Sequence, residues 1–467
     1  MMKTRKGYKV YPLTVAQKFH FFYLDFCPKK QVLNIGNSLV IEVELDFEQL
    51  KKAIYKAYER CESMRLRFAQ DKEGNWYQYV VDREERDIEF VDFTGQTVEQ
   101  ADAVMQGWTE VPFEHHDAPQ NRIVMIKLPD GYSGVYMLVD HLTMDAQSII
   151  CFLKDVIEIY CNAMYEDVPY PKEMASYITQ LKKDLAYEAG CRAKERDEEF
   201  FRKLIESSEP VYNGVDGTRR LDEARERTGN PDVRAALNVS DSVESALDIF
   251  HLEAEPTKRL MDFCEKYHVS LVCLLMMGLR TYFQKMNGHD DVSINTAIAR
   301  RATLQEKKSG GTRIHSFPFR TILSTDRTFL EGIYEMRDRQ NELFRHANYD
   351  PVAYFAHRGR TYPAEPGATY EPMSLTYQPL TLKEKGLDKL GDIRYRTKWY
   401  PNGATTQAMY LTVMHRSDDN GLDFNFEHQI KAVSREQLEY FYYYLCKIMF
   451  KGIEDPEQTI GAIINAV

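Results

Sequence analysis

The stretch VDHLTMDAQS, Val139 to Ser148, decides how this sequence is to be read. The apolar segment GVYMLV runs into it and predicts a buried strand. His141 follows that strand, and Asp145 stands four residues later, before a helical apolar pattern. Two interpretations compete: His141 is a catalytic residue at a strand end, or it is a turn histidine whose neighbour Asp145 caps the next helix. A cap alone contributes about 1 kcal/mol to helix stability.

Length and composition limit the class of protein. A chain of 467 residues exceeds what one hydrophobic core supports, so more than one packed unit is expected. The net charge of −11 argues against broad binding to nucleic acid or to anionic membranes, which require a positive face. The longest apolar run, Val269 to Leu279, is shorter than the roughly 20 residues that cross a bilayer, and no apolar signal peptide follows the basic amino terminus. We therefore expect a cytoplasmic protein without a membrane span.

The eight cysteines are scattered, and none forms a CxxC pair. Most stand inside apolar helical patterns, which is typical of small buried thiols in a reducing compartment. The sequence therefore predicts neither a disulfide framework nor a metal site, and no bound cofactor.

Strands and helices alternate through both halves of the chain, which predicts a mixed α/β fold. SLVIEVELD (38–46) indicates a strand, and Asp46 with Gln49 three residues on is typical of a helix start. A second start of this kind, Ser434 with Gln437, precedes the last helix.

The chain changes character in its middle. A charged helix is predicted over roughly 172–206, and the polar stretch 207–246 has little periodicity, which indicates a mobile connection. We expect an N-terminal lobe over 1–175 that carries the histidine motif, a bridging helix and linker over 176–250, and a C-terminal lobe over 251–467.

Taken in order, several segments resemble the condensation domain of nonribosomal peptide synthetases, which belongs to the chloramphenicol acetyltransferase-like superfamily. The family patterns are an opening SxAQ, RHExLRxxF, the histidine motif HHxxxDG, a strand that ends in arginine, and FVNTxxLR. The matching segments are YPLTVAQKFHFF (11–22), RCESMRLRF (60–68), DHLTMDA (140–146), DDVSINTAIARRA (290–302), RIHSFPFR (313–320), LFRHANYDPVAYF (343–355) and GLDFNFEHQI (421–430). They span essentially the whole chain.

The resemblance implies a fold and a reaction. The fold would be an α+β sandwich of two lobes in a V with a central tunnel, and His141 would be the base or hydrogen-bonding group in it. Imidazole suits that role because its unperturbed pKa of about 6.5 leaves it mostly neutral in the cell. The substrates would be thioesters on the phosphopantetheine arm of a carrier protein. No adenylation or carrier domain fits beside the resemblance, so the donors are expected to arrive in trans.

The resemblance also implies support for the histidine loop. Asp145 would pair with an arginine of the other lobe, with Arg301 as the first choice and Arg300 as the alternative. The chain departs from the motif at Asp140, where the family has its first histidine, and at Ala146, where it has glycine. Asp140 is expected to support the loop. An adjacent carboxylate could also raise the pKa of His141, although adjacent side chains on a strand point to opposite faces. Phe19 stands where many relatives carry arginine.

Other candidates are weaker. His115 and His116 in FEHHDAP indicate a loop before a strand, with neither a catalytic nor a metal role. Thr376, Tyr377 and Gln378 fall where relatives have a strand that lines the tunnel, and a plain strand is the competing interpretation. The stretch 300–313 holds five basic residues and one acidic one. It predicts a solvated loop, with a contact to an acidic carrier protein or to a coenzyme A phosphate as the alternative.

We therefore predict a free-standing condensation-type acyltransferase that forms amides or, less often, esters. An acyltransferase that uses free acyl-coenzyme A is the second hypothesis. A non-catalytic module that docks carrier proteins is the third, suggested by the departures at Asp140 and Ala146, and an epimerase or cyclase variant of the fold also stays open.

Overall fold

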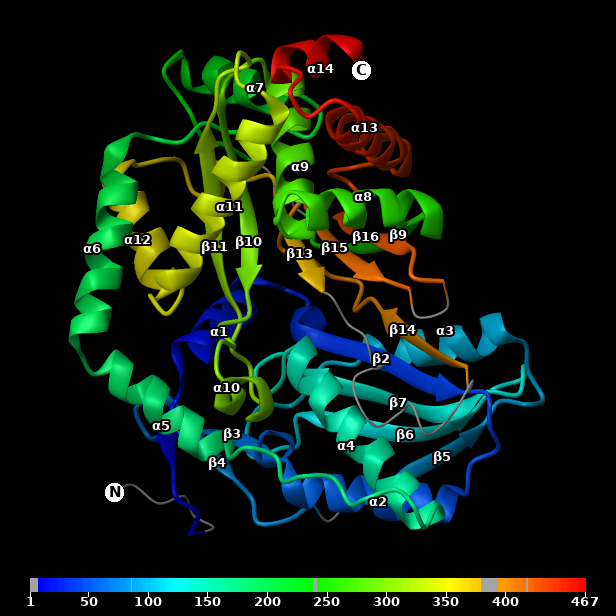
Figure 1. Cartoon of the computed structure of the whole chain (residues 1–467). Coiled ribbons are helices and arrows are strands. Elements are labelled where there is room, and N and C mark those ends of the chain that lie inside the picture. Colours follow the sequence, from blue (N-terminus) through cyan, green and yellow to red (C-terminus); the bar gives the residue numbers. More distant parts are fainter. Residues whose placement is uncertain (1–6, 85, 238–241, 379–393, 417–418) are drawn as a thin grey trace. The chain divides into compact units, whose positions relative to one another are not determined.

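The computed structural model describes residues 7–84, 86–237, 242–378, 394–416 and 419–467 (Figure 1). The chain divides into two compact units. Unit 1 comprises Met1–Cys191, Ala299–Ile314 and Leu380–Ala404, and unit 2 comprises Arg192–Ile298, His315–Pro379 and Thr405–Val467. These units differ from the linear boundaries expected from the sequence, because two later segments of the chain return to unit 1.

Unit 1 is built on a five-stranded sheet in the order β14-β2-β7-β6-β5, beside a three-stranded sheet β1-β4-β3. Its strands are β1 (Tyr11–Pro12), β2 (Asn34–Ile41), β3 (Leu66–Gln70), β4 (Trp76–Val80), β5 (Glu89–Asp92), β6 (Asn121–Lys127), β7 (Ser133–Asp140) and β14 (Tyr395–Tyr400). Its helices are α1 (Val15–Phe26), α2 (Phe47–Arg60), α3 (Val98–Thr109), α4 (Ala146–Met164), α5 (Tyr177–Glu188) and α10 (Leu304–Lys308), with 3-10 turns at Lys30–Leu33 and Glu62–Arg65.

Strand β7 is the centre of the five-stranded sheet and is buried along its whole length. It pairs antiparallel with β2 on one side and β6 on the other. A side chain at Gly134 would meet the carbonyl oxygen of Leu39 at 2.1 Å, so glycine lets β2 approach β7. This central place explains why GVYMLV is a continuous apolar run rather than an alternating one.

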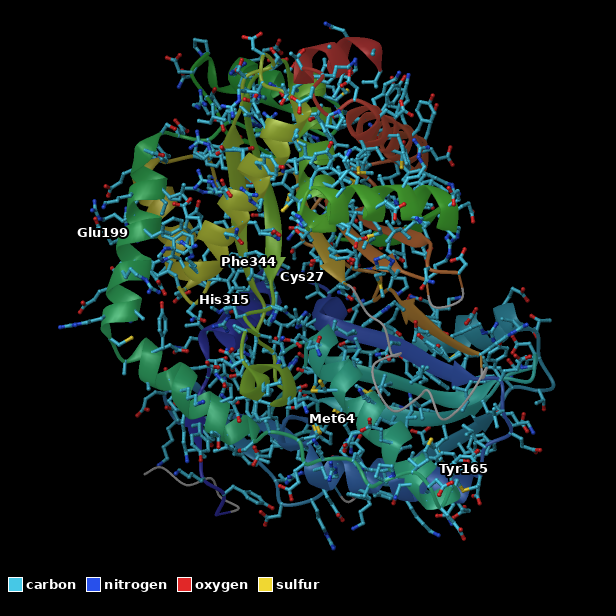
Figure 2. The ribbon with its side chains drawn as sticks, in the orientation of Figure 1. Cys27, Met64, Tyr165, Glu199, His315 and Phe344 are labelled. Carbon is cyan, nitrogen blue, oxygen red and sulfur yellow. The ribbon has the colours of Figure 1, made fainter. Side chains whose placement is uncertain are left out.

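Helices cover both faces of that sheet. Helices α2 and α4 pack on one face, and the predicted inner face of α2 is buried as expected. Met64, labelled in Figure 2, belongs to that core and is fully buried, whereas Tyr165, just beyond α4, is exposed. Helix α3 covers the other face with Ala101 and Met105. The rigid sheet therefore fixes the residues at the end of β7.

Unit 2 is built on a six-stranded sheet in the order β11-β10-β13-β15-β16-β9, with a small pair β12-β8. Its strands are β8 (Ala236–Leu237), β9 (Ser245–Leu252), β10 (Asp291–Ile298), β11 (His315–Ile322), β12 (Ala368–Thr369), β13 (Met373–Gln378), β15 (Met409–His415) and β16 (Leu422–Gln429). Its helices are α6 (Arg192–Ser207), α7 (Arg219–Thr228), α8 (Ala254–Lys266), α9 (Leu271–Asn287), α11 (Phe329–Arg345), α12 (Pro351–Thr361), α13 (Arg435–Glu454) and α14 (Ile460–Ala466). Helix α9 is buried almost all round, between α11 and α13. The predicted cap of α13 by Ser434 and Gln437 is confirmed.

Two predictions for the middle of the chain are wrong. The helix predicted over 172–206 is two helices, α5 and α6, which Gly190 separates with a φ of 116°. The stretch 207–246 is not a mobile connection where the structure describes it, because it forms α7 and β8 around Tyr212, Leu221 and Ala236. Residues 238–241 of that prediction lie outside the described residues. Within the described ranges, no helix combines the length and apolarity needed to cross a membrane.

Candidate active site

The turn between β7 and α4 holds His141 in one place. The backbone N–H of His141 donates to the carbonyl oxygen of Leu33 at 2.9 Å, and that of Thr143 donates to the carbonyl oxygen of Asp140 at 2.9 Å. The Asp140 carboxylate accepts a further bond from the Leu142 N–H at 2.7 Å. Asp140, at the place of the family's first histidine, therefore bonds within the loop.

Asp145 performs both of the predicted structural tasks at once. It caps α4, because its Oδ1 accepts the Ser148 N–H at 3.0 Å. It also pairs with Arg301, whose Nη2 lies 2.9 Å from Oδ1 and 2.8 Å from Oδ2. Both side chains are buried. Burial alone opposes ionisation, but Arg301 and the Ser148 N–H hold the pKa of the Asp145 carboxyl below its usual value.

Arg301 is the partner of Asp145, and the alternative Arg300 is not. The expectation that this arginine comes from the other lobe is corrected, because Arg301 lies in the segment Ala299–Ile314 of unit 1. Arg300 instead adopts a φ of 50° and donates through Nε to the carbonyl oxygen of Arg313 at 2.8 Å. That left-handed residue turns the chain at the end of β10 and directs Arg301 toward Asp145.

The basic stretch 300–313 is not uniformly solvated. Arg301 and Arg313 are both buried. The backbone N–H of Arg313 donates to Asp145 Oδ2 at 3.0 Å, and its guanidinium pairs with Asp184 and Glu306. Of the five basic residues, only Lys307 and Lys308 are exposed to solvent. The stretch is thus a strap that fixes Asp145, and the predicted contact with a carrier protein or coenzyme A stays a prediction.

Ala146 fits the site without strain. It is the first residue of α4, and among the described residues the non-glycine positions with positive φ are Asp117, His268, Arg300 and Asn420. Alanine therefore costs nothing through backbone conformation where the family has glycine.

The His141 ring lies between polar groups and retains some exposed surface. Its Nδ1 is 3.3 Å from Thr312 Oγ1. Burial lowers the pKa of His141 below its usual value. Asp145, the ring's bond to its own backbone and Asp140 act to raise this pKa, but burial has the larger effect. Asp140 thus acts in the expected direction but does not prevail. A neutral imidazole can accept a proton, so the arrangement suits a general base.

For three polar residues near His141, the sequence predicted no role in the site. His115 Nε2 lies 2.8 Å from Asp140 Oδ2, which makes it the partner of a fully buried carboxylate. The sequence held a signal for it, because β6 pairs antiparallel with β7 and the residues before β6 therefore lie beside the end of β7. His20 and Thr312 also lie beside His141. Nothing in their spacing indicated this.

Removing the imidazole of His115 is expected to destabilise unit 1. In His115→Leu the buried Asp140 carboxylate loses this partner, which should cost about 1–3 kcal/mol of unfolding free energy. Urea unfolding followed by circular dichroism measures it. His116→Leu is the matched control, because His116 is exposed and adjacent. Equal unfolding midpoints for the two variants would contradict a supporting role for His115.

The predicted tunnel residues lie on β13 in unit 2. Thr376 Oγ1 lies 2.6 Å from Tyr410 Oη, and Tyr377 Oη lies 2.9 Å from His415 Nε2. The Oε1 atom of Gln378 is buried without a hydrogen-bond partner among the described residues. The strand is confirmed, and contact of these residues with a substrate stays a prediction.

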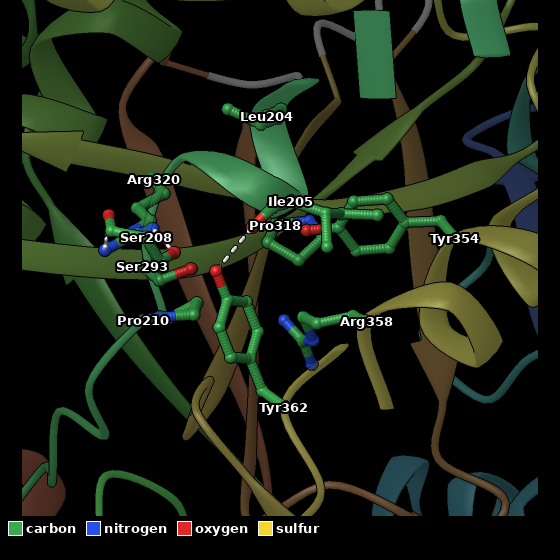
Figure 3. Close-up of a pocket in the computed structure, with 10 residues that line it drawn as sticks. All are labelled: Leu204, Ile205, Ser208, Pro210, Ser293, Pro318, Arg320, Tyr354, Arg358 and Tyr362. Atoms are coloured by element: carbon green, nitrogen blue, oxygen red, sulfur yellow. Dashed lines mark hydrogen bonds between the residues drawn. The ribbon is translucent and has the colours of Figure 1, made fainter. Parts of the chain in front are cut away.

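Figure 3 shows a cavity in unit 2 that is too small for a substrate. Its volume of about 10 Å³ holds at most one water molecule. Tyr362, which lines it, donates through Oη to the Ile205 carbonyl oxygen at 3.0 Å. In the part of the chain that the structure describes, no group of three or more His, Cys, Asp or Glu side chains is arranged to hold a metal ion.

Comparison with known proteins gives consistent matches over nearly the whole chain. A family model described as Condensation domain matches residues 8–464. Surfactin synthase subunit 1 of Bacillus subtilis (strain 168) is 22% identical over 97% of this chain, and Tyrocidine synthase 2 of Brevibacillus parabrevis is 23% identical over 97% of it. The chain spans only 12% of the length of each of these two relatives.

Solved structures of the same kind share the fold. The first condensation domain of the calcium-dependent antibiotic synthetase, in complex with substrate analogue 2a, has a TM-score of 0.79 at 17% identity and covers 97% of this chain and 99% of its own. A variant of the starter condensation domain of rhizomide synthetase, in complex with C8-CoA, has a TM-score of 0.80 at 17% identity, with 97% of both chains covered. The predicted mixed fold is thereby confirmed.

Proposed function

Because the family model covers residues 8–464, this chain belongs to the condensation-domain family, and we propose that it joins a carrier-bound acyl or aminoacyl thioester to an amine. Amide formation by acyl transfer is the reaction of that family. The identity of the thioester and of the amine, operation as a free-standing enzyme, and delivery of substrates in trans are the finer parts of the proposal.

The observation that carries this proposal is the imidazole of His141, which the turn after β7 holds near the Asp145–Arg301 pair and whose pKa burial lowers. In the proposed reaction the amine nitrogen attacks the thioester carbonyl carbon. His141 accepts the proton that the amine loses, the C–S bond breaks, and the proton passes to the departing phosphopantetheine thiolate. A positioned base contributes about 10²–10⁴-fold to such a step.

Asp145 and Arg301 support this chemistry indirectly. Neither needs to touch the substrate, because together they fix the turn that holds His141 and the start of α4. Holding two tethered reactants at one base lowers the activation barrier further. For well-oriented groups this reduction reaches about 7–11 kcal/mol. A tunnel that leads both arms to His141 is part of the proposal.

The alternative of a non-catalytic docking module rested on the departures at Asp140 and Ala146. Asp140 bonds the Leu142 N–H and pairs with His115, and Ala146 begins α4 without a left-handed backbone. Both departures are therefore compatible with a formed histidine loop, which favours catalysis over docking alone.

The test supplies one carrier protein loaded with an acyl thioester and a second loaded with an aminoacyl thioester. Intact-mass spectrometry of the second carrier should show the gain of the acyl group, at a rate that depends on this protein. A parallel reaction with acyl-coenzyme A at equal concentration addresses the second hypothesis, for which the C8-CoA complex of the starter domain is the supporting observation. Faster acyl transfer from acyl-coenzyme A than from the loaded carrier would identify coenzyme A as the donor. Binding of carriers without any acyl transfer would reject the enzymatic proposal.

A further inference from the structure

A second imidazole lies against His141 in unit 1. The ring centroids of His20 and His141 are 4.2 Å apart with an interplanar angle of 33°. The hydroxyl oxygen of Thr312 lies 3.2 Å from His20 Nε2 and 3.3 Å from His141 Nδ1, so it bridges the two rings. His20 and Thr312 are both buried.

The fold places these groups together for identifiable reasons. Thr14 and Gln17 form a capping box that starts α1, and the Gln17 Nε2 group donates to the carbonyl oxygen of Leu142 at 3.3 Å. His20 is three residues after Gln17, on the same face of α1, so it too faces the histidine loop. Thr312 follows Gly311, whose carbonyl oxygen accepts bonds from Ser148 Oγ and Arg301. Two separate segments are thus anchored to the loop and present side chains to His141.

We propose that His20, acting through the Thr312 hydroxyl, is a positioning residue that fixes the tautomer and the ring orientation of His141. This inference rests on the proposed role of His141 as a base. His141 Nδ1–H donates to Thr312 Oγ1, and the Thr312 O–H donates to His20 Nε2. The proton of neutral His141 therefore stays on Nδ1, and Nε2 keeps the lone pair that accepts the proton of the amine.

The hydroxyl has one hydrogen, and this gives the bridge its direction. While His20 Nε2 accepts that hydrogen, Thr312 can only accept from His141 Nδ1. Without the acceptor on His20, the hydroxyl can turn and donate to Nδ1, in competition with the bond between the His141 ring and its own backbone. That reversal favours the tautomer of His141 with its proton on Nε2, which has no lone pair for the amine.

The charges around the two rings agree with this direction. Burial and the neighbouring His141 lower the pKa of His20 well below its usual value, which keeps Nε2 available as an acceptor. Asp145 and Asp140 act on His141 from the loop, and Arg301 neutralises Asp145. Burial therefore keeps His20 uncharged beside the proposed base.

Nitrogen-15 NMR of histidine-labelled protein tests the tautomer without any assay of activity, because protonated and unprotonated ring nitrogens resonate far apart. At a pH where His141 is neutral, its Nδ1 should carry the proton in the parent protein. In His20→Leu and in Thr312→Val, the Nε2-protonated form should gain population. In His20→Gln, whose side-chain oxygen can accept from Thr312, the parent pattern should return.

Kinetics with carrier-bound substrates provides the second readout. His20→Leu and Thr312→Val should each lower kcat by up to about 100-fold with little change in KM, and the double variant should be no slower than the worse single variant. His20→Gln should recover most of the rate, and His116→Leu is the histidine control. Unchanged tautomer populations in both His20→Leu and Thr312→Val would overturn the inference even if the protein forms amides. Tautomer changes in a protein that forms no amide would leave the bridge in place and reject only the proposed reaction.

Discussion

His141→Ala is expected to lower the single-turnover rate of amide formation by about 10²–10⁴-fold, which is the usual contribution of a positioned base. The KM for the loaded donor carrier should change little, because the imidazole acts on the proton and not on the pantetheine arm. Loss of fold should not contribute, since the loop is held by the His141 backbone N–H, by Asp140 and by Asp145, all of which the variant retains.

Rapid-quench reactions with intact-mass detection measure this rate. His116→Ala is the matched control, since it removes an exposed histidine from the same unit and should leave the rate unchanged. Thermal unfolding of His141→Ala should agree with the parent protein within a few degrees. A variant that folds and retains a rate within threefold of the parent would remove His141 from the mechanism.

Arg301→Ala is expected to cost about 3–5 kcal/mol of unfolding free energy, because it leaves the Asp145 carboxylate buried without its charged partner. Arg301 also donates to Ser148 Oγ and to the Gly311 carbonyl oxygen, so its removal loosens both the start of α4 and the strap that carries Thr312. Amide formation should therefore fall together with stability.

Urea unfolding at pH 7 measures the loss, and two further variants isolate its cause. Arg301→Lys keeps the charge but not the planar donor group, so an intermediate loss is expected. Asp145→Asn combined with Arg301→Ala removes the buried charge as well and should be more stable than Arg301→Ala alone. If the double variant were no more stable, the unpaired carboxylate would not be the source of the loss.

The pH dependence of this pair follows from the lowered pKa of Asp145. A carboxyl whose folded pKa lies below its unfolded value stabilises the protein above the unfolded pKa of about 3.9, and that contribution fades as pH falls below it. Without Arg301, burial raises the pKa of Asp145, so the difference in unfolding free energy between the parent protein and Arg301→Ala should be larger at neutral pH than at about pH 4. Urea unfolding at the two pH values measures it.

The sequence predicted the fold well where a local pattern coincides with burial. The continuous apolar run before His141 marks the central strand β7, and Asp145 and Ser434 begin helices as expected. The apolar pattern did not predict ordered structure where buried residues are few and widely spaced. In 207–246 the small core of Val211, Tyr212 and Leu221 is diluted by polar residues, so an ordered segment looked like a linker.

The site was predictable only in part, for a physical reason. His141, Asp145 and Arg301 lie in segments that match motifs of the family. His20, His115 and Thr312 reach the same place through tertiary packing: α1 is anchored by Gln17, and Thr312 by the strap. The bonds of Gln17 to Leu142 and of Thr312 to His20 join segments more than a hundred residues apart, and the bond of His115 to Asp140 joins residues 25 positions apart. Neither kind of bond leaves a periodic pattern in a single sequence.

The proposed mechanism requires His141 to be an uncharged base in the folded protein at cellular pH. Carbon-13 NMR of protein labelled at the histidine Cε1 position measures it, with His141→Gln to assign the resonance. The titration midpoint of His141 is expected to lie below 6.5, because burial outweighs the carboxylates of Asp145 and Asp140. A midpoint above 6.5, with the ring charged at neutral pH, would contradict it.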